Sequence, residues 1–223
     1  MLDKLMQDLR MFLPPLLDGA VTTIELTAVS FVLAVLIGLG VCLCRISGLP
    51  VVARAATYYI EIIRGTPLLL QLFYIYYALP DVGIRLPAFH AGVVGLSINF
   101  GAYLAELFRA GIQSIETGQT QAARSLGMTT SQLMRHVILP QALRVIFPAL
   151  GNYALVLVKE SSLVAVLSVR ELMRTGELLA SSTFQTMKVF TLVGAIYLIV
   201  SYALSLAFRR FERRLSIPGV GGF

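Results

Sequence analysis

Five stretches of the chain are apolar over about 20 consecutive residues each. They cover residues 22–44, 57–79, 89–108, 137–158 and 189–208. A helix rises about 1.5 Å per residue and the hydrocarbon of a membrane is about 30 Å thick, so about 20 apolar residues can cross it. The pattern therefore predicts an all-α integral membrane protein with five transmembrane helices.

The second and fourth stretches are interrupted by residues that disturb helices. The fourth contains Pro140 and Pro148, and the second contains the sequence Gly65-Thr66-Pro67. Proline removes a backbone donor and clashes with the preceding turn, and hydrocarbon offers the freed backbone groups no partner. We therefore expect the second span to be broken, with the break facing protein or a water-filled cavity.

Two segments outside the spans also have helical spacing of apolar residues. Residues 1–18 form the first, which we interpret as an amphipathic helix in the membrane interface that ends at Pro14 and Pro15. The second, residues 168–182, is too polar to cross a membrane, and we expect a helix on the outer surface.

The composition supports a membrane protein and excludes several other classes. Of 223 residues, 57% are hydrophobic and 13% are charged, about half the charge content of a soluble domain. The net charge of +6 does not indicate nucleic-acid binding, because the basic residues lie between apolar runs. Cys42 and Cys44 are too few for a disulfide framework or a metal site, so no metal is predicted. The sequence also contains no enzyme constellation, so no catalytic residue is predicted.

Basic residues predict the orientation of the chain. They gather after the first, third and fifth apolar stretches, which places these loops in the cytoplasm, the N-terminus outside and the C-terminus inside. Arg170, Arg174 and Lys188 would lie outside in this arrangement and weaken the bias.

Residues 115–140 form a long cytoplasmic loop with the signals of two short helices. Thr117 or Thr120 is a candidate cap of the first helix, and Gly127 is a candidate for its left-handed end. Thr129 or Thr130 would begin the second helix. Ala122 and Ala123 give the first helix a small-residue face that another surface can approach closely.

This loop resembles the EAA loop of bacterial ABC-importer permeases. The matching residues, in the family's register, are Gln121-Ala122-Ala123, Gly127 and Val137-Ile138-Leu139-Pro140. The chain departs from the pattern at Gln121, where the family has Glu, and at Val137, where it has Ile. The first departure removes a carboxylate that would face the ATPase subunit.

Residues 61–72 and 159–163 also resemble the polar amino-acid permeases, which include glutamine, cystine and histidine/arginine importers. The resemblance implies a type I ABC-importer permease fold with an interfacial helix at residues 1–18, a transmembrane domain at 19–215 and a tail at 216–223. It also implies a multi-pass protein of the bacterial inner membrane that carries a polar amino acid from periplasm to cytoplasm.

The resemblance further implies partners. They are two copies of an ATP-binding cassette subunit, a second permease subunit of the same or a related chain, and a periplasmic amino-acid-binding protein. The chain has no phosphate-binding Gly-x-x-x-x-Gly-Lys-Ser/Thr loop, so ATP and Mg²⁺ would belong to the ATPase and this chain would hold no cofactor. By family analogy the ATPase docks on residues 117–132, chiefly on Gln121, Ala122, Ala123, Ser125, Leu126, Gly127 and Met128.

Polar residues within or next to the spans suggest a substrate site, because charges inside a membrane usually face a cavity or a partner. Our hypothesis is that Arg64, aided by the helix break, binds a substrate carboxylate, and that Glu160, Glu61 or Glu106 binds the ammonium group. The full candidate set is Arg64, Glu61, Thr66, Asn99, Glu106, Glu160 and Ser161. Structural ion pairs between Glu61 and Arg64, or between Glu106 and Arg109, are the alternative.

A secondary transporter or channel subunit that works without an ATPase is the alternative function. Such folds often contain paired repeats, and no repeat is visible in this sequence. The sequence decides neither which amino acid is carried nor whether the permease is a homodimer or a heterodimer.

Overall fold

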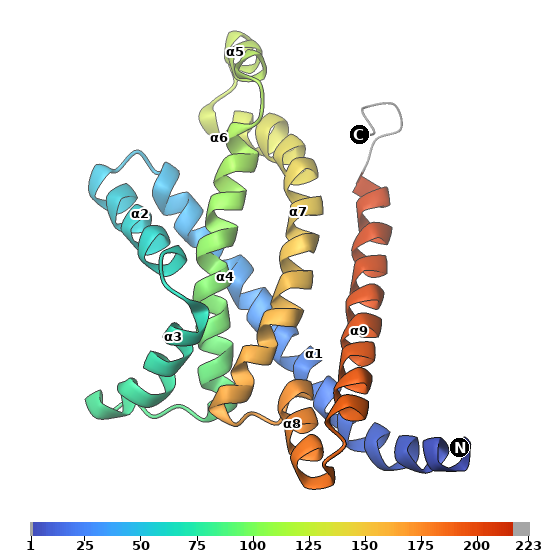
Figure 1. The fold of residues 1–223 in the computed structure, drawn as a ribbon. Coiled ribbons are helices and arrows are strands. Elements are labelled where there is room, and N and C mark those ends of the chain that lie inside the picture. Colours follow the sequence, from blue (N-terminus) through green and yellow to red (C-terminus); the bar gives the residue numbers. More distant parts are fainter. Residues whose placement is uncertain (1, 216–223) are drawn as a thin grey trace.

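The computed structural model describes the backbone of residues 2–215 and the side chains of residues 9–213. This part of the chain contains helices and connecting turns only (Figure 1). The elements are α1 (Leu2–Ile46), α2 (Pro50–Arg64), α3 (Leu68–Phe73), η1 (Tyr74–Ala78), η2 (Leu79–Val82), α4 (Ala88–Gln113), α5 (Thr117–Ser125), α6 (Thr130–Leu133), η3 (Met134–Ile138), α7 (Leu139–Glu160), η4 (Ser161–Leu167), α8 (Leu172–Thr183) and α9 (Thr186–Leu215).

The five predicted spans correspond to four long helical segments and one bent pair. The long segments are Leu9–Ile46, Ala88–Gln113, Thr130–Leu167 and Thr186–Arg213. The fifth is the pair Pro50–Arg64 and Leu68–Val82, whose two parts meet at 102°. The second span therefore begins seven residues earlier than expected, at Pro50, which occupies the first helical turn where its missing N–H costs nothing.

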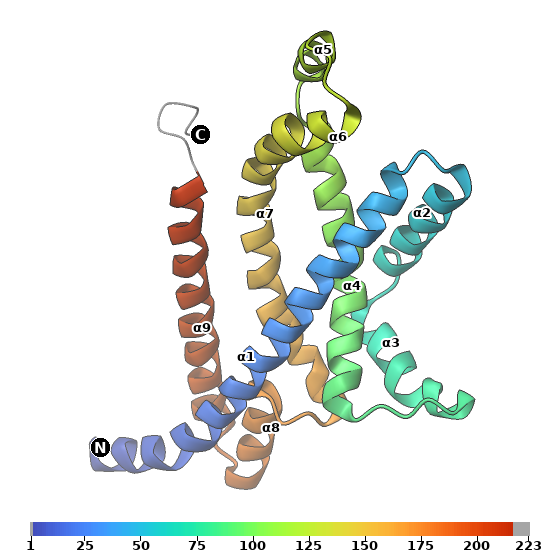
Figure 2. The same cartoon turned by 180° about the vertical axis from the view of Figure 1, so that it is seen from behind.

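The prediction that the first helix ends at Pro14 and Pro15 is wrong. α1 continues through both prolines, and Figure 2 shows its N-terminal part at an angle to the rest. Phe12 before the prolines and Leu16 after them are fully buried in one apolar cluster with residues of α8 and α9. Packing on both sides of the prolines holds the helix together, so the two missing donors bend it instead of ending it.

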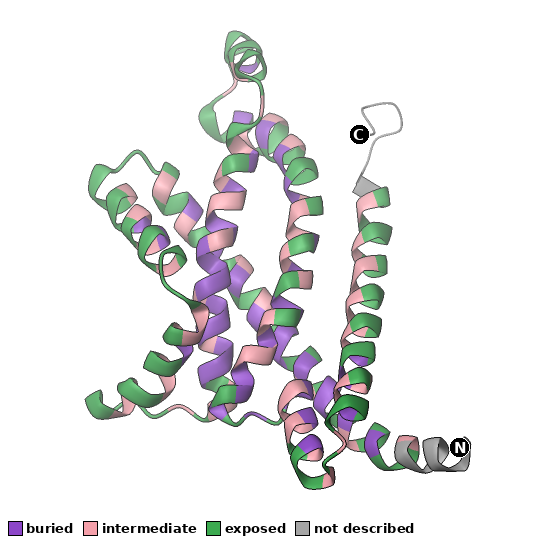
Figure 3. Cartoon of the chain, in the orientation of Figure 1, coloured by how far each residue is buried: buried purple, intermediate pink, exposed green. Residues whose placement is uncertain are grey.

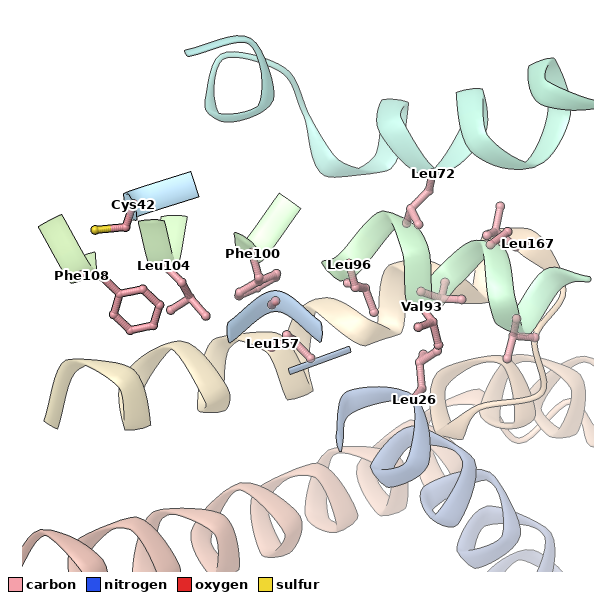
Figure 4. Close-up of a cluster of buried hydrophobic side chains, with 14 of the residues drawn as sticks. Leu26, Cys42, Leu72, Val93, Leu96, Phe100, Leu104, Phe108, Leu157 and Leu167 are labelled. Atoms are coloured by element: carbon pink, nitrogen blue, oxygen red, sulfur yellow. The ribbon is translucent and has the colours of Figure 1, made fainter. Parts of the chain in front are cut away.

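α4 lies at the centre of the bundle, and more than half of its residues are buried (Figure 3). Its close crossing with α1 depends on Gly38 and Gly101. A Cβ at Gly38 would lie 2.8 Å from the Cβ of Leu104, and one at Gly101 would lie 2.6 Å from Cγ2 of Ile37. Leu96, Phe100, Leu104 and Phe108 extend the core along α4 (Figure 4).

Glu171 joins three helices at the start of α8. Its carboxylate accepts hydrogen bonds from the backbone N–H of Met173 (2.9 Å) and Arg174 (2.6 Å), from the Tyr197 hydroxyl of α9 (2.9 Å) and from the Thr23 hydroxyl of α1 (3.5 Å). The residue is fully buried, and burial raises the pKa of its carboxyl while the four hydrogen bonds oppose that shift. The predicted non-spanning helix is therefore present, and a buried carboxylate fastens it to the bundle.

We predict that Glu171→Ala lowers the free energy of unfolding by about 2–4 kcal/mol, because it leaves two backbone N–H groups and a tyrosine hydroxyl buried without an acceptor. Denaturant titration of the purified protein in detergent measures the change. The matched control is Glu177→Ala, which removes a half-exposed carboxylate 3.0 Å from Arg174 and should cost about 1 kcal/mol or less. Equal losses from the two variants would contradict this role for Glu171.

Candidate functional site

The predicted break in the second span is confirmed at Gly65-Thr66-Pro67. α2 ends at Arg64, and Pro67 is extended, with φ −63° and ψ 136°. Gly65 is needed where the chain leaves α2, because a Cβ there would lie 2.8 Å from the carbonyl oxygen of Glu61. The break sharply redirects the chain between α2 and α3 (Figure 1).

Gln71 of α3 reaches back across the break and satisfies its backbone. Its Nε2 donates to the carbonyl oxygens of Ile63 (2.8 Å) and Thr66 (3.2 Å) and to the Thr66 hydroxyl (2.7 Å). Asn99 of α4 in turn donates from Nδ2 to Oε1 of Gln71 at 3.0 Å. This chain of hydrogen bonds supplies the partners that hydrocarbon cannot, and it ties the break to the central helix.

A cavity of about 500 Å³ opens beside the break. α2 and the break contribute one wall, α4 the second and α7 the third. The lining residues are Arg64, Gly65, Thr66, Pro67, Leu68, Asn99, Phe100, Tyr103, Tyr153, Val156 and Glu160.

The cavity contains one basic and one acidic side chain. Arg64 places its guanidinium 5.1 Å from the centre of the Tyr103 ring, a cation–π contact. Within the part of the chain that the structure describes, neither Arg64 nor Glu160 forms an ion pair. A cavity that offers a guanidinium, a carboxylate and aromatic rings can bind a molecule that carries both charges.

The structure brings four of the seven candidate site residues to this cavity: Arg64, Thr66, Asn99 and Glu160. Two of them, Thr66 and Asn99, also take part in the hydrogen bonds at the helix break. The Thr66 hydroxyl donates to the carbonyl of Ile62 at 2.9 Å and accepts from Gln71, and the Asn99 amide nitrogen is bonded to Gln71.

Glu61, Glu106 and Ser161 lie outside the cavity. Glu61 is exposed on α2, and Ser161 is fully buried with its hydroxyl bonded to the carbonyl of Val158 at 2.7 Å. Glu106 forms ion pairs with Arg45 at the end of α1 and with Arg109 one turn along α4. The structural alternative therefore holds for Glu106, whereas the described residues show no pair between Glu61 and Arg64.

The loop between α4 and α7 forms the expected helix, turn and second helix. The caps of α5 differ from the prediction, because Glu116 precedes the helix and no side chain caps it. Gly127 is left-handed, with φ +75°, as expected. Thr129 caps α6 in a capping box with Gln132, and the helix itself begins at Thr130, so the predicted start of the second helix is confirmed.

The faces of α5 differ in exposure. Ala123 is buried with Leu133 and Ile138 in a small cluster that holds α5 to the rest of the chain. Ala122 is exposed, and 79% of the Leu126 surface is accessible. The predicted small-residue face is therefore divided, because only Ala122 is available to a partner.

Gln71, Tyr103 and Tyr153 are site residues that the sequence analysis did not single out. Gln71 lies four residues after the proline of a broken span, and an amide at that spacing is a detectable signal. The two tyrosines carry no local signal, because only the packing of α4 against α7 places their rings 6.2 Å apart at the cavity. Among the described residues there is no cluster of three or more His, Cys, Asp or Glu that could hold a metal ion.

Comparison with known proteins identifies the architecture. Residues 30–217 match the family model described as "Binding-protein-dependent transport system inner membrane component". A probable glutamine ABC transporter permease protein, GlnM of Bacillus subtilis (strain 168), is 41% identical over 199 residues, which cover 89% of this chain and 92% of that protein. The glutamine transport system permease protein GlnP of Escherichia coli (strain K12) is 37% identical over 207 residues, 92% and 94% of the two chains.

A solved structure agrees with these sequence matches. The crystal structure of an amino acid ABC transporter with histidines contains a chain that superposes with a TM-score of 0.88 at 42% identity. The superposition covers 93% of this chain and 97% of that chain. Fold and sequence therefore point to the same kind of protein.

We predict that Gln71→Leu loosens the helix break without unfolding the bundle. Loss of the amide leaves the Thr66 carbonyl without its side-chain donor and the Ile63 carbonyl with only the 3.4 Å contact of the Thr66 hydroxyl. Amide exchange of residues 62–71 should therefore accelerate about tenfold. Hydrogen–deuterium exchange with mass spectrometry measures this exchange rate. The control is Gln141→Leu, which removes a bond only to Val137 of the preceding turn. Unchanged exchange of residues 62–71 would show that Gln71 does not hold the break.

Proposed function

Because the chain belongs to the family of binding-protein-dependent transport system inner membrane components, we propose that it is the membrane-spanning subunit of an ATP-driven importer of amino acids. The curated relatives named glutamine permeases support amino acids as the substrate class. As an inner membrane component of a transporter, the chain moves the substrate across the membrane, and a partner subunit hydrolyses ATP.

The observation that carries the substrate proposal is the cavity between α2, α4 and α7. An amino acid is a zwitterion, and the cavity offers Arg64 to its carboxylate and Glu160 to its ammonium group. Arginine binds carboxylates through two parallel hydrogen bonds, which adds orientation to attraction. α3 is only six residues long, so the guanidinium supplies more of the positive field than the helix end does.

The size and polarity of the cavity fit a small polar ligand. Sites for small molecules have volumes of about 300–1,000 Å³, and this cavity has about 500 Å³. In many transporters, broken membrane helices form the substrate site near the middle of the bilayer. Tyr103 and Tyr153 would hold the aliphatic part of the substrate, while the helix break provides polar backbone groups beside it.

The exposed surface of α5 is the proposed docking site for the ATPase. Leu126 and Ala122 offer a small apolar surface, and Gln121 beside them is exposed and uncharged. An apolar residue that is mostly exposed at the tip of a loop fits a groove in another protein. Ser125, Gly127 and Met128 complete the proposed contact region, whereas buried Ala123 supports it from below.

A continuous helical path links this docking surface to the cavity. α6, η3, α7 and η4 together span Thr130–Leu167, and this path carries Tyr153 and Glu160. The π-helical turn at Met134–Ile138 is the irregular point on the path. Movement of α5 by the ATPase would be carried along this path to one wall of the cavity.

The proposed assembly contains two ATPase copies, a second permease subunit and a periplasmic amino-acid-binding protein. This chain encloses the cavity only in part, so a second permease subunit would complete the route. We place residues 1–18 on the periplasmic side and the permease domain at residues 19–215. The proposed tail, residues 216–223, lies outside the described residues. ATP and Mg²⁺ are assigned to the ATPase.

We predict that Arg64→Gln and Glu160→Gln each raise the substrate concentration for half-maximal uptake about 10- to 100-fold, because each removes one charged hydrogen-bonding group from the substrate. Uptake is measured in proteoliposomes that contain the complete complex and a saturating amount of binding protein.

The matched control is Arg54→Gln, which neutralises an exposed arginine of α2 outside the cavity and should leave uptake unchanged. Co-purification of the ATPase shows that each variant is assembled. Normal half-saturation in both cavity variants would remove Arg64 and Glu160 from the substrate site, although the transport function itself would stand.

We predict that Leu126→Glu abolishes co-purification of the ATPase with this chain, because a carboxylate at the most exposed apolar residue of the loop would have to be buried at the interface. Affinity purification from native membranes, with the ATPase quantified by mass spectrometry, is the measurement. Gln113→Glu, which adds the same charge at an exposed residue of α4 outside residues 117–132, beside Arg109, is the control. Full recovery of the ATPase with Leu126→Glu would place the docking surface elsewhere.

A further inference from the structure

A second hollow, separate from the substrate cavity, lies between α1, α7 and α9. It has a volume of about 510 Å³ and is lined almost entirely by apolar side chains. Ala28 of α1, Ala154 of α7 and Ala203 of α9 create the space, and Phe31 and Phe208 meet edge to face at one end of it. We call this hollow the α9 groove.

The α9 groove has the depth of one leaflet of a membrane. Its α9 wall extends from residue 199 to residue 208, a rise of about 14 Å, close to half of the roughly 30 Å of hydrocarbon. All three walls belong to membrane-spanning segments. An apolar hollow of this size in a bilayer does not stay empty, because its lining would lose its dispersion contacts.

Arginines continue the walls of the groove at one end. Arg210 lies seven residues after Ala203 on α9, and Arg144 lies seven residues before Gly151, which packs against Phe208. Seven residues are close to two helical turns, so Arg210 shares the side of α9 that carries Ala203, and Arg144 shares the side of α7 that faces Phe208. Both are exposed, and neither is bonded to another described residue.

Another hollow, of about 480 Å³, adjoins this end of α9 and is lined by Leu206, Ala207, Arg209, Arg210 and Arg213. Glu212 is the one acidic residue in positions 209–213, so this turn has a net charge of +2 from three arginines and one glutamate. The end of α9 lies at the same end of the bundle as α5 (Figures 1 and 2). The basic residues therefore lie where the headgroups of the leaflet on the α5 side begin.

We propose that the α9 groove binds one anionic phospholipid of the leaflet on the α5 side. An acyl chain fills the apolar hollow, and the phosphate lies near Arg144 and Arg210. Basic residues at the membrane end of a pocket between helices recognise anionic headgroups. A second copy of this chain is the less favourable occupant, since it would bring its own arginines to the same end.

Fluorescence quenching by brominated phospholipids tests the proposal. The chain contains no tryptophan, so Ile199→Trp places a reporter at the rim of the groove and Leu198→Trp places one on the opposite face of α9. Both wild-type side chains are mostly exposed, at 66% and 71%. The complete complex is reconstituted in vesicles with brominated phosphatidylglycerol or brominated phosphatidylcholine, and the fluorescence of the parent complex is subtracted.

We expect the Ile199→Trp reporter to favour phosphatidylglycerol over phosphatidylcholine by about fivefold for each arginine that contacts the phosphate. The preference should disappear when Arg144→Gln and Arg210→Gln are added, and it should persist with Arg54→Gln. The Leu198→Trp reporter should be quenched equally by the two lipids in every background.

Equal quenching of Ile199→Trp by both lipids would overturn the proposal, because it would indicate ordinary surrounding lipid. Absence of quenching at Ile199→Trp alone would also overturn it, because it would show that a protein segment covers the groove. Mass spectrometry of lipids retained after detergent washing is an independent measurement. Ala203→Phe, which fills the groove, should lose phosphatidylglycerol, whereas Ala195→Phe outside the groove should retain it; retention by both would contradict the site.

Discussion

The architecture depends on one constraint, which is that a backbone polar group in hydrocarbon must find its partner within the protein. Helices meet this constraint by themselves, and the described chain is accordingly helical from α1 to α9. Among the described residues, the sharp break inside a span lies at Gly65-Thr66-Pro67. It is permitted because Gln71 donates hydrogen bonds to its backbone, and Asn99 holds Gln71 in place. The cavity lies beside this break because a span can be broken only where protein or water is present.

A related constraint applies to charged side chains, because a charge removed from water also needs a partner. It separates four charged residues of the bundle into two groups. Glu106 is neutralised by Arg45 and Arg109, and Glu171 is satisfied by four hydrogen-bond donors, so both carboxylates hold helices together. Arg64 and Glu160 have no such partner among the described residues, and they face a cavity. A charge inside the bundle that has a complete set of partners stabilises the fold, whereas one without a partner that faces a cavity is available to a ligand.

Exposure divides the apolar residues in a comparable way. Ala123 is buried and anchors α5, while Leu126 beside it is exposed and available to another subunit. The α9 groove shows the same contrast inside the membrane, where Phe208 packs on Gly151 while Ala203 leaves a hollow. Both surfaces fit the proposed assembly, in which one meets a protein partner in water and the other a lipid in the bilayer.

The sequence by itself determined the features that follow from local rules. Apolar runs of about 20 residues predicted the spans, Gly65-Thr66-Pro67 predicted the break, and Gly127 and Thr129 marked the turn of the docking loop. Only the tertiary structure decided which residues meet, because spacing along one helix does not show which neighbour its faces contact. Glu106 pairs with Arg45, 61 residues earlier, while Glu160 shares a cavity with Arg64. α1 passes through Pro14 and Pro15, since residues distant in the sequence pack on both sides of the bend.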